Sequence, residues 1–382
     1  MKFKLKKRHI VIAAVNAAAA ASILTLSLVG NAMIKDQAYN DSARFWSPDK
    51  DFTQMSCFLS DDSGMTTDNV MAVRTMLNKK LEDVSLVAED GRSLITDGYS
   101  KPIGKMNFQG NTNKTTEAQV TVAGGNFFLF RNFILLHGSY FSDSDLRQDG
   151  VVLSENLAWE LFGSTDIAGM TVTVNSRDFF VCGVISEPSS KLDKKTAGEG
   201  YRAYISYKGA ELINGSQSSF SDSTSAAAST SSAEKGITCY ECIMPSPVKN
   251  YAYNSFKEYF DSNFKDKFET VNNTERFSSG SLVKAYKKRS EFAVRDSAVI
   301  FPYWENASRI AEFKLSSVYF WRRICCIPLI LTALWLIVRL WIIGGKYKRR
   351  LTSFLAETIN DTMYKISTRK QKKDELSSER NA

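Results

Sequence analysis

The chain has 382 residues, 43% of them hydrophobic, and a formal net charge of +8, which is enough for two or three domains. The positive charge lies at the ends: residues 1–34 carry +5, residues 318–343 carry +3 and residues 344–382 carry +5, which leaves −5 for residues 35–317. A mildly acidic centre excludes a nucleic-acid-binding domain, because such a domain needs a basic face to replace phosphate counterions.

A long apolar run covers residues 10–34, directly after the basic N-terminus at 1–9. The run is long enough to cross a bilayer as a helix. A cleaved signal peptide is the alternative, but its apolar core is usually only about 7 to 15 residues long. We therefore predict an uncleaved transmembrane helix over 10–34.

The central part, residues 35–317, begins with a polar leader at 35–52. A helix is predicted over 66–82, because Val70, Val73, Leu77 and Leu81 recur at helical spacing. Turn-forming residues separate several strand-like runs in this part, which indicates an α+β domain. The runs are 84–88, 105–109, 118–122 and 127–136.

The stretch 138–185 has the densest pattern in the chain. Residues 151–153 predict a short strand, and Ser154 is a typical N-cap for a helix that Gly163 ends. A hairpin packed beside this helix should follow, with strands at 170–174 and 179–185 and a turn at 175–178.

A polar connection follows at 187–200, and the alternation of 201–206 predicts a strand. Residues 215–234 are rich in Ser, Thr and Ala and predict a disordered surface loop, although a sugar-bearing or wall-spanning stalk stays open. A strand at 237–244 and an aromatic helix at 251–264 complete the central part.

The second transmembrane helix is predicted over 318–343, and basic residues follow it at 346–350. Basic residues also precede the first span, so the positive-inside rule predicts both termini in the cytoplasm and residues 35–317 outside the cell membrane. Arg322 and Arg323 on the outer flank oppose this orientation, but they are outnumbered.

The basic tail at 344–382 contains an amphipathic pattern over 351–366. Two roles are open for this segment. It lies in the membrane interface, helped by nearby lysines and anionic lipid, or it docks onto a cytoplasmic partner.

The sequence predicts no catalytic, cofactor or metal site. Its only histidines are His9 and His137, too few for a histidine-based triad or a multi-histidine metal site in the central part. Asp143, Asp145 and Asp149 lack the glycine and terminal Glu of an EF-hand loop. The sequence also lacks the phosphate-binding loop Gly-x-x-x-x-Gly-Lys-Ser/Thr, so it has no nucleotide site of that kind.

The six cysteines are predicted to be structural or free. Cys239 and Cys242 form a C-x-x-C in a strand-like run, where positions i and i+3 point to opposite faces, which is unsuitable for a redox pair or two zinc ligands. The pairing of the four outer cysteines stays open; the outer set is Cys57, Cys182, Cys239 and Cys242, and the span holds Cys325 and Cys326.

Five short elements follow one another in the stretch 138–185. They are Gly138, Phe141 and Asp145; Val151 to Ser154; Ala158, Leu161, Phe162 and Gly163; Ile167 and Gly169; and Val181 with Gly183 to Ile185. In the order and spacing of these elements the stretch resembles the extracytoplasmic core domain of the macrolide-exporter (MacB-like) permease family. The resemblance implies a MacB-like α+β core of two subdomains flanked by the two spans. One subdomain is inserted at 126–236 and the other is built from 50–125 and 237–317, with Asp145 as a turn residue.

The family's permeases continue into further spans that couple to a cytoplasmic ATPase, whereas this sequence has one predicted span after the central domain. The resemblance therefore implies a non-enzymatic, two-span subunit or relative of an ABC-type export or mechanotransmission system in the bacterial cell membrane. Its expected partners are the lipid bilayer, a separate ABC ATPase and a multi-span permease subunit, with homo- or heterodimers open. The alternative is a membrane-anchored adhesion or ligand-binding module that acts without an ATPase.

Overall fold

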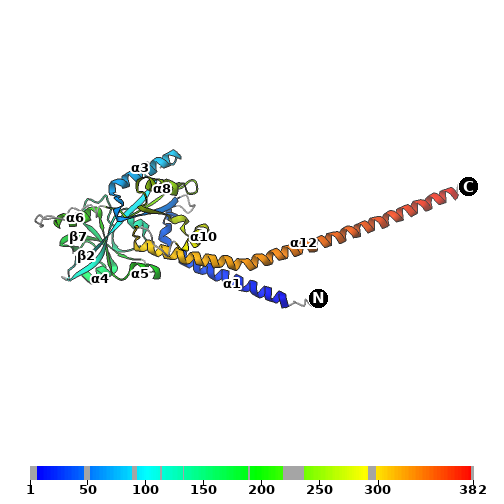
Figure 1. The fold of residues 1–382 in the computed structure, drawn as a ribbon, viewed down its shortest axis with the longest axis horizontal. Helices are drawn as coiled ribbons and strands as arrows, with labels where there is room; N and C mark the ends of the chain where they lie inside the picture. The colour runs from blue at the N-terminus through cyan, green and yellow to red at the C-terminus, as the bar shows by residue number, and fades with distance from the viewer. Residues whose placement is uncertain are drawn as a thin grey trace. The chain divides into compact units, whose positions relative to one another are not determined.

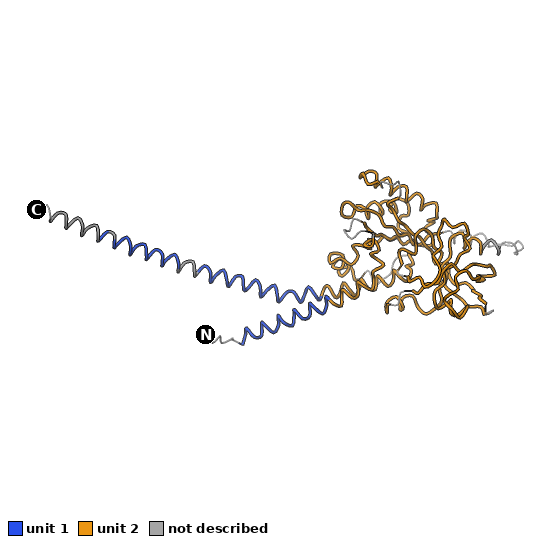
Figure 2. The backbone as a smooth tube through the Cα atoms, turned by 180° about the vertical axis from the view of Figure 1, so that it is seen from behind, with its two compact units in different colours: residues 1–27, 321–382 blue, residues 28–320 orange. Residues whose placement is uncertain are grey.

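The computed structural model describes residues 7–46, 52–87, 93–111, 114–131, 133–187, 190–217, 236–290 and 298–379. The chain divides into two compact units, which Figure 2 colours separately. Residues 28–320 form the first, called here the sheet unit. Residues 1–27 and 321–382 form the second, called the span unit.

The sheet unit contains a ten-stranded mixed sheet in the order β10-β1-β9-β2-β3-β8-β5-β7-β4, with β6 beside both β2 and β7 (Figure 1). The pairings of β2, β3, β8, β5, β7 and β6 close a ring, so these strands have few open edges. The strands are β1 Phe52–Leu59, β2 Thr96–Gln109, β3 Thr115–Gly125, β4 Ile134–Gly138, β5 Gly150–Ser154, β6 Thr171–Val174, β7 Arg177–Ser186, β8 Tyr201–Ser206, β9 Cys239–Pro245 and β10 Phe268–Asn272.

The helices cover the sheet or belong to the span unit, and this combination confirms the predicted α+β class with two apolar helices. The longer ones are α1 Lys7–Lys35, α3 Thr67–Asp83, α4 Glu155–Phe162, α6 Tyr207–Gln217, α8 Tyr251–Asn263, α10 Ser279–Lys287 and α12 Tyr303–Glu379. The short ones are α2 Ala43–Trp46, α5 Lys191–Ala197, α9 Asn273–Arg276, and the 3₁₀ turns η1 Ala38–Asp41, η2 Asp61–Ser63 and η3 Phe127–Phe130.

The predicted helices at 66–82 and 251–264 are α3 and α8, which lie side by side in Figure 1. Thr66 begins α3 with a capping box, in which its backbone N–H donates to Asn69 Oδ1 at 2.9 Å. The four apolar residues of the α3 stripe are all buried and pack with Phe256 and Phe260 of α8. We call this cluster the α3–α8 core.

The strand, helix and hairpin predicted within 138–185 are confirmed as β5, α4, β6 and β7. Leu157, Ala158 and Leu161 of α4 are fully buried in a cluster that we call the α4 core, and Gly163 ends the helix in the left-handed conformation. Ser154 occupies the N-cap position, but its hydroxyl accepts a bond from the Arg202 N–H at 3.1 Å and so ties β5 to β8.

The hairpin turn is tighter than predicted. Asn175 and Ser176 alone form it, with φ of 45° and 68°, while Arg177 and Asp178 already belong to β7. Two successive residues with positive φ match the twist of a two-residue hairpin, and Asn tolerates that conformation.

An aromatic core covers the face of the sheet opposite to the α3–α8 core. Side chains alternate along β1, so that Cys57 points into the α3–α8 core and Phe58 into the aromatic core. The aromatic core also contains Phe127, Phe128, Tyr204, Phe301 and Trp304.

Two predicted strands are wrong in part. Residues 84–87 are not a strand, because Val84 caps α3 and Ser85 turns the chain with φ of 61°; Ala88 lies outside the described residues. In the predicted strand 127–136, residues 127–130 form η3, since Asn126 donates its N–H to the Asp97 carbonyl and turns the chain, and β4 begins only at Ile134.

Three predicted irregular segments contain helices. The leader at 35–52 holds η1 and α2, while 47–51 lie outside the described residues. The connection at 187–200 holds α5, which Ser190 caps by accepting the Asp193 N–H at 3.1 Å. Of the loop predicted at 215–234, residues 215–217 belong to α6, and 218–234 lie outside the described residues.

Two described helices are long and apolar enough to cross a membrane, namely α1 and the 303–345 part of α12. The predicted spans at 10–34 and 318–343 fall within them. The helix α12 continues to Glu379, so the amphipathic segment 351–366 is part of the same helix and not a separate element. Leu351, Leu355, Ile359 and Met363 on it are exposed.

Candidate functional site: a polar join at the membrane-flanking segments

The three aspartates that were weighed as calcium ligands bind separate partners. Asp143 accepts hydrogen bonds from the Gly125 N–H and the Tyr99 hydroxyl, Asp145 accepts the Ser142 N–H, and Asp149 pairs with Arg147 at 2.7 Å. Asp145 and Asp149 therefore stabilise their own turn, and Asp143 attaches that turn to β2 and β3. Among the described residues, no group of three or more His, Cys, Asp or Glu side chains is arranged to hold a metal ion.

Cys239 and Cys242 lie in β9 and point to opposite faces, as predicted, with Cys239 in the aromatic core and Cys242 in the α3–α8 core. Both are free thiols, as are Cys57 and Cys182. Burial raises the pKa of Cys57, Cys239 and Cys242 well above its ordinary value, which keeps these thiols protonated and weakly reactive.

The residues that carry the family resemblance are structural. Gly138 has φ of 79°, and a Cβ there would lie 2.1 Å from the Cys182 carbonyl oxygen. Gly183 is equally confined, since a Cβ would lie 2.5 Å from the Ser139 carbonyl oxygen. Phe141 is buried in the aromatic core. The glycines of the motif therefore let β4 close onto β7.

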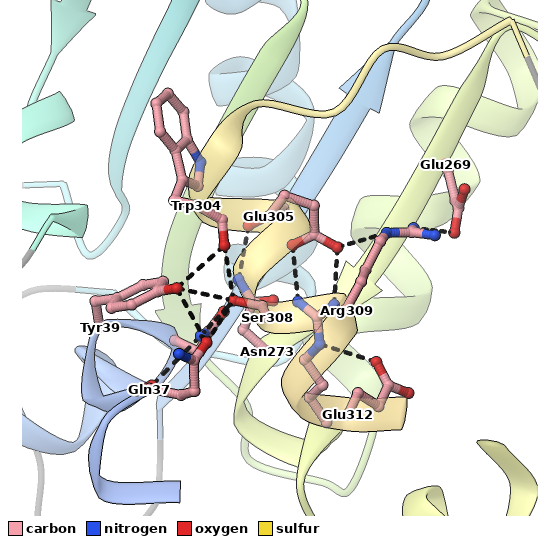
Figure 3. A network of polar contacts seen from close by, with 12 residues as sticks. Gln37, Tyr39, Glu269, Asn273, Trp304, Glu305, Ser308, Arg309 and Glu312 are labelled. Carbon is pink, nitrogen blue, oxygen red and sulfur yellow. Dashed lines mark hydrogen bonds and ion pairs between the residues drawn. The ribbon is translucent and has the colours of Figure 1, made fainter. Parts of the chain in front are cut away.

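The most elaborate polar cluster lies where the leader and the start of α12 meet the sheet (Figure 3). These two segments adjoin the two predicted spans in the sequence. We call the cluster the polar join. Its members are Gln37, Tyr39 and Asn40 of the leader, Ser56 and Glu241 of the sheet, Arg131, Glu269, Asn273 and Arg276, and Trp304, Glu305, Ser308, Arg309 and Glu312 of α12.

The Tyr39 hydroxyl is the centre of the first part of the join. It lies 3.0 Å from Gln37 Oε1, 3.1 Å from the Trp304 carbonyl oxygen and 3.1 Å from Ser308 Oγ. Asn40 Nδ2 donates to the same Ser308 oxygen at 2.9 Å. Gln37, Tyr39, Asn40 and Ser308 are all buried, so these bonds replace the water that a polar leader would otherwise bind.

The leader is also fixed to the sheet. The Ser42 N–H donates to Gln54 Oε1 of β1 at 2.7 Å, and Gln54 Nε2 donates to the Tyr39 carbonyl oxygen at 3.1 Å. One residue of β1 thus bonds the leader both within η1, at Tyr39, and just before α2, at Ser42. The leader, the sheet and the start of α12 are held as one structure.

A buried ion network forms the second part. Arg276 of α9 binds Glu305 of α12 with two bonds of 2.7 and 2.8 Å, and its Nε donates to Glu312 at 3.0 Å. Arg309 donates to Glu305 at 2.8 Å and pairs with Glu269 of β10. Burial raises the pKa of Glu312, whereas the charge on Arg276 opposes that rise.

The third part lies beside the aromatic core. Arg131 pairs with Glu241 of β9, and their side chains are only 3% and 4% exposed. Ser56 Oγ donates to Glu241 at 3.1 Å, and Asn273 Nδ2 donates to Ser56 at 2.6 Å. The Arg131 guanidinium also lies 4.0 Å from the centre of the Trp304 ring, which joins this pair to α12.

The ring of strands contacts the join through α5. Asp193 of α5 is buried and interacts with Tyr39, and burial raises the pKa of its carboxyl, with Asp36 adding to the rise. Nearby, Arg202 of β8 pairs with Glu187 at 2.5 Å and lies over the Tyr303 ring. Both ends of the sheet unit's sequence therefore contact the part that holds the family motif.

The arrangement holds chain segments together through paired charges and amides, and the described members of the join include no Cys or His nucleophile or base. Sequence reasoning missed the join, because it described the leader only as polar and predicted no partner for it. A signal existed in the spacing of Glu305, Ser308, Arg309 and Glu312, which places four polar residues on one face of a helix just before an apolar span.

Comparison with known proteins found a family whose model matches this chain. Residues 10–238 match the MacB-like periplasmic core domain family. No curated protein matches the sequence.

Three solved structures are similar to the chain. The periplasmic region of MacB from Actinobacillus actinomycetemcomitans is 17% identical, with 58% of this chain and 89% of that chain covered and a TM-score of 0.37. The extracellular domain of the noncanonic ABC-type transporter YknZ from Gram-positive bacteria is 14% identical, with 57% and 100% covered and a TM-score of 0.34. A domain of a putative permease protein from Porphyromonas gingivalis is 14% identical, with 58% and 90% covered and a TM-score of 0.33.

The family match covers more than half of the chain and includes the first apolar helix and the stretch in which the resemblance was found. The two candidate spans lie before and after the sheet-forming residues in the sequence. The chain belongs to the MacB-like periplasmic core domain family, as a membrane-associated member with a periplasmic-type domain between two candidate spans.

Proposed function

We propose that the chain is a non-enzymatic membrane subunit of an ABC-type export or mechanotransmission system, and that it works with a separate ATPase. Its outer domain passes movement between the segments next to the spans and the family-motif part of the sheet unit. This role needs a firm attachment between those segments and the sheet.

The polar join is the observation that carries the proposal. Two segments distant in sequence, the leader and the start of α12, are bonded to one another through Tyr39 and Ser308 at 3.1 Å. Buried pairs such as Arg276 with Glu305 then attach α12 to the sheet. A module that only displayed a binding surface would not need both membrane-flanking segments attached to its domain, the leader by buried hydrogen bonds and α12 by buried ion pairs.

We propose the following membrane layout. Residues 1–9 and 344–382 are cytoplasmic, 10–34 and 318–343 are the spans, and 35–317 are outside, with the subdomain at 126–236 inserted in the outer domain. The layout rests on the basic residues at 2–8 and 346–350. An engineered cysteine at Ser218 should react with an impermeant maleimide in whole cells, and one at Ser377 only after permeabilisation. If the cysteine at position 377 reacted in whole cells and the one at position 218 only after permeabilisation, the proposed layout would be wrong.

The partner is tested by affinity purification of the full chain from crosslinked native membranes. The proposal predicts recovery of an ATP-binding protein or a multi-span permease, while the purified chain itself binds no nucleotide because its sequence lacks a phosphate-binding loop. Removing residues 351–382 should weaken the recovery, since the amphipathic segment 351–366 is the proposed docking site, and should leave the outer domain folded.

A matched control replaces Asn360 and Thr362, which are exposed polar residues of the same segment, with alanine while the apolar residues stay. Recovery should then be unchanged. If no ATP-binding protein or permease is recovered, and the truncation alters nothing, the transport role fails and an adhesion or ligand-binding role becomes the better account.

A further inference from the structure

A hydrogen bond joins the two apolar helices inside the span unit. Asn16 Nδ2 of α1 donates to Thr332 Oγ1 of α12 at 3.1 Å. With the hydroxyl turned the other way, Thr332 Oγ1 donates to Asn16 Oδ1 at 3.3 Å. Both residues lie within the predicted spans, where hydrocarbon offers no water to a polar side chain.

The other bonded polar side chains on this part of α1 behave differently. Ser22 and Thr25 donate to carbonyl oxygens of their own helix, those of Ala18 and Ala21, at 2.9 and 3.0 Å. Such back-bonds satisfy a hydroxyl without a second helix. Asn16 instead makes its described hydrogen bond across to α12, which gives it a role in pairing the helices.

Thr332 lies one turn after Pro328, the proline inside α12. Its hydroxyl is 2.8 Å from the Pro328 carbonyl oxygen, within bonding distance in its own helix. Proline lacks an N–H, so the Ile324 carbonyl has no helical donor at this turn. The bond from Asn16 therefore holds α12 just beside the turn where that helix bends most easily.

The two helices run antiparallel in this unit. Asn16 meets Thr332, and His9, earlier in α1, meets Trp335, later in α12, with ring centroids 6.3 Å apart. We propose that Asn16 and Thr332 form a hydrogen-bonded latch that fixes the register of the two spans. The inference rests on both helices crossing the membrane and is independent of the proposed ATPase partner.

Crosslinking in native membranes tests the latch. Two helical turns from Asn16 lies Ile23, and two turns from Thr332 in the opposite direction lies Cys325, so the proposed register brings these positions together. The reporter chain carries Ile23→Cys and Cys326→Ser, and mass spectrometry measures the initial rate at which residues 23 and 325 are linked by copper phenanthroline. The latch predicts rapid linkage within one chain.

Asn16→Val or Thr332→Val in this reporter should slow linkage between about 3-fold and about 20-fold, the range expected for interhelical hydrogen bonds in membranes. The exchanged pair Asn16→Thr with Thr332→Asn keeps both polar groups and should restore most of the rate. Thr25→Val, which removes only a bond within α1, should leave the rate unchanged. Absent linkage in the parent reporter, equal slowing by Thr25→Val, or no recovery by the exchanged pair would each overturn the latch.

Discussion

The α4 core and the polar join are both buried, yet they are built from opposite chemistry. The α4 core is formed by apolar side chains from residues 106–213, such as Leu157, Leu161 and Val181, and each recurs within its own element at the period of a helix or a strand. The polar join brings residues from the leader, the sheet, α9 and α12 together through paired charges and amides. The first region needs only shape and apolarity, whereas every member of the second depends on a partner distant in sequence.

This difference predicts different responses to mutation. Apolar packing is non-directional and loses stability in proportion to the contacts removed. A buried ion pair contributes little more to stability than an apolar pair in its place. Removing one partner nevertheless costs much stability, because the other charge stays buried without compensation. The join therefore specifies an arrangement more than it adds stability.

The largest effect is expected in the α4 core. Leu161→Asp places a charge where the side chain is fully buried, and should lower the free energy of unfolding by about 4 to 5 kcal/mol. Urea unfolding of the full chain in detergent measures it. Trp159→Asp on the same helix is the control, since Trp159 is 55% exposed and the change there should be below about 1 kcal/mol. Equal losses at the two sites would refute the assigned face of α4.

A somewhat smaller effect is expected at the ion network of the join. Arg276→Met leaves Glu305 buried without its two short bonds and should lower the free energy of unfolding by about 3 kcal/mol. Adding Glu305→Gln should recover much of the loss, because the buried charge is then removed. The role assigned to the ion network is wrong if Arg276→Met is as stable as the parent, or if adding Glu305→Gln lowers the free energy of unfolding further.

These two predictions mark what the sequence revealed and what it did not. The period of Val70, Val73, Leu77 and Leu81 predicted α3, and Ser154 with Gly163 predicted the bounds of α4, because both signals are local. No local signal marked Gln37, Tyr39 and Asn40. A polar leader has the same sequence pattern whether its side chains bind water or a distant residue such as Ser308. The family resemblance was found on residues that shape turns or fill the core, such as Gly138 and Leu161, so it revealed the fold and not the join.

A modest effect is expected from the Tyr39 hydroxyl. Tyr39→Phe keeps the ring and removes the bonds to Gln37, Trp304 and Ser308, so the free energy of unfolding should fall by about 1 kcal/mol. The same urea titration checks it. Tyr364→Phe in the exposed tail should leave the free energy of unfolding unchanged. If the Tyr39 hydroxyl adds no stability, the two variants will have the same free energy of unfolding.

The smallest effect is expected from Asp193 and depends on pH. Burial raises the pKa of the Asp193 carboxyl in the folded state, so the folded state favours the protonated form. The resulting contribution to stability is complete below the ordinary Asp pKa of about 3.9 and is lost as the pH rises through the raised pKa. Asp193→Asn should therefore gain stability relative to the parent between about pH 4 and pH 7. Thermal melts of both chains across this range measure the difference, and parallel pH profiles would contradict the role of burial.

Hydrogen–deuterium exchange of the full chain in nanodiscs tests most directly whether the polar join attaches the membrane-flanking segments to the sheet. The double change Tyr39→Phe with Ser308→Ala removes the two hydroxyl groups that bond the leader to α12. The account predicts faster exchange at 38–46 and 303–310, with exchange at 155–162 in α4 unchanged. Unchanged exchange at the first two segments, or an equal rise in all three, would contradict it.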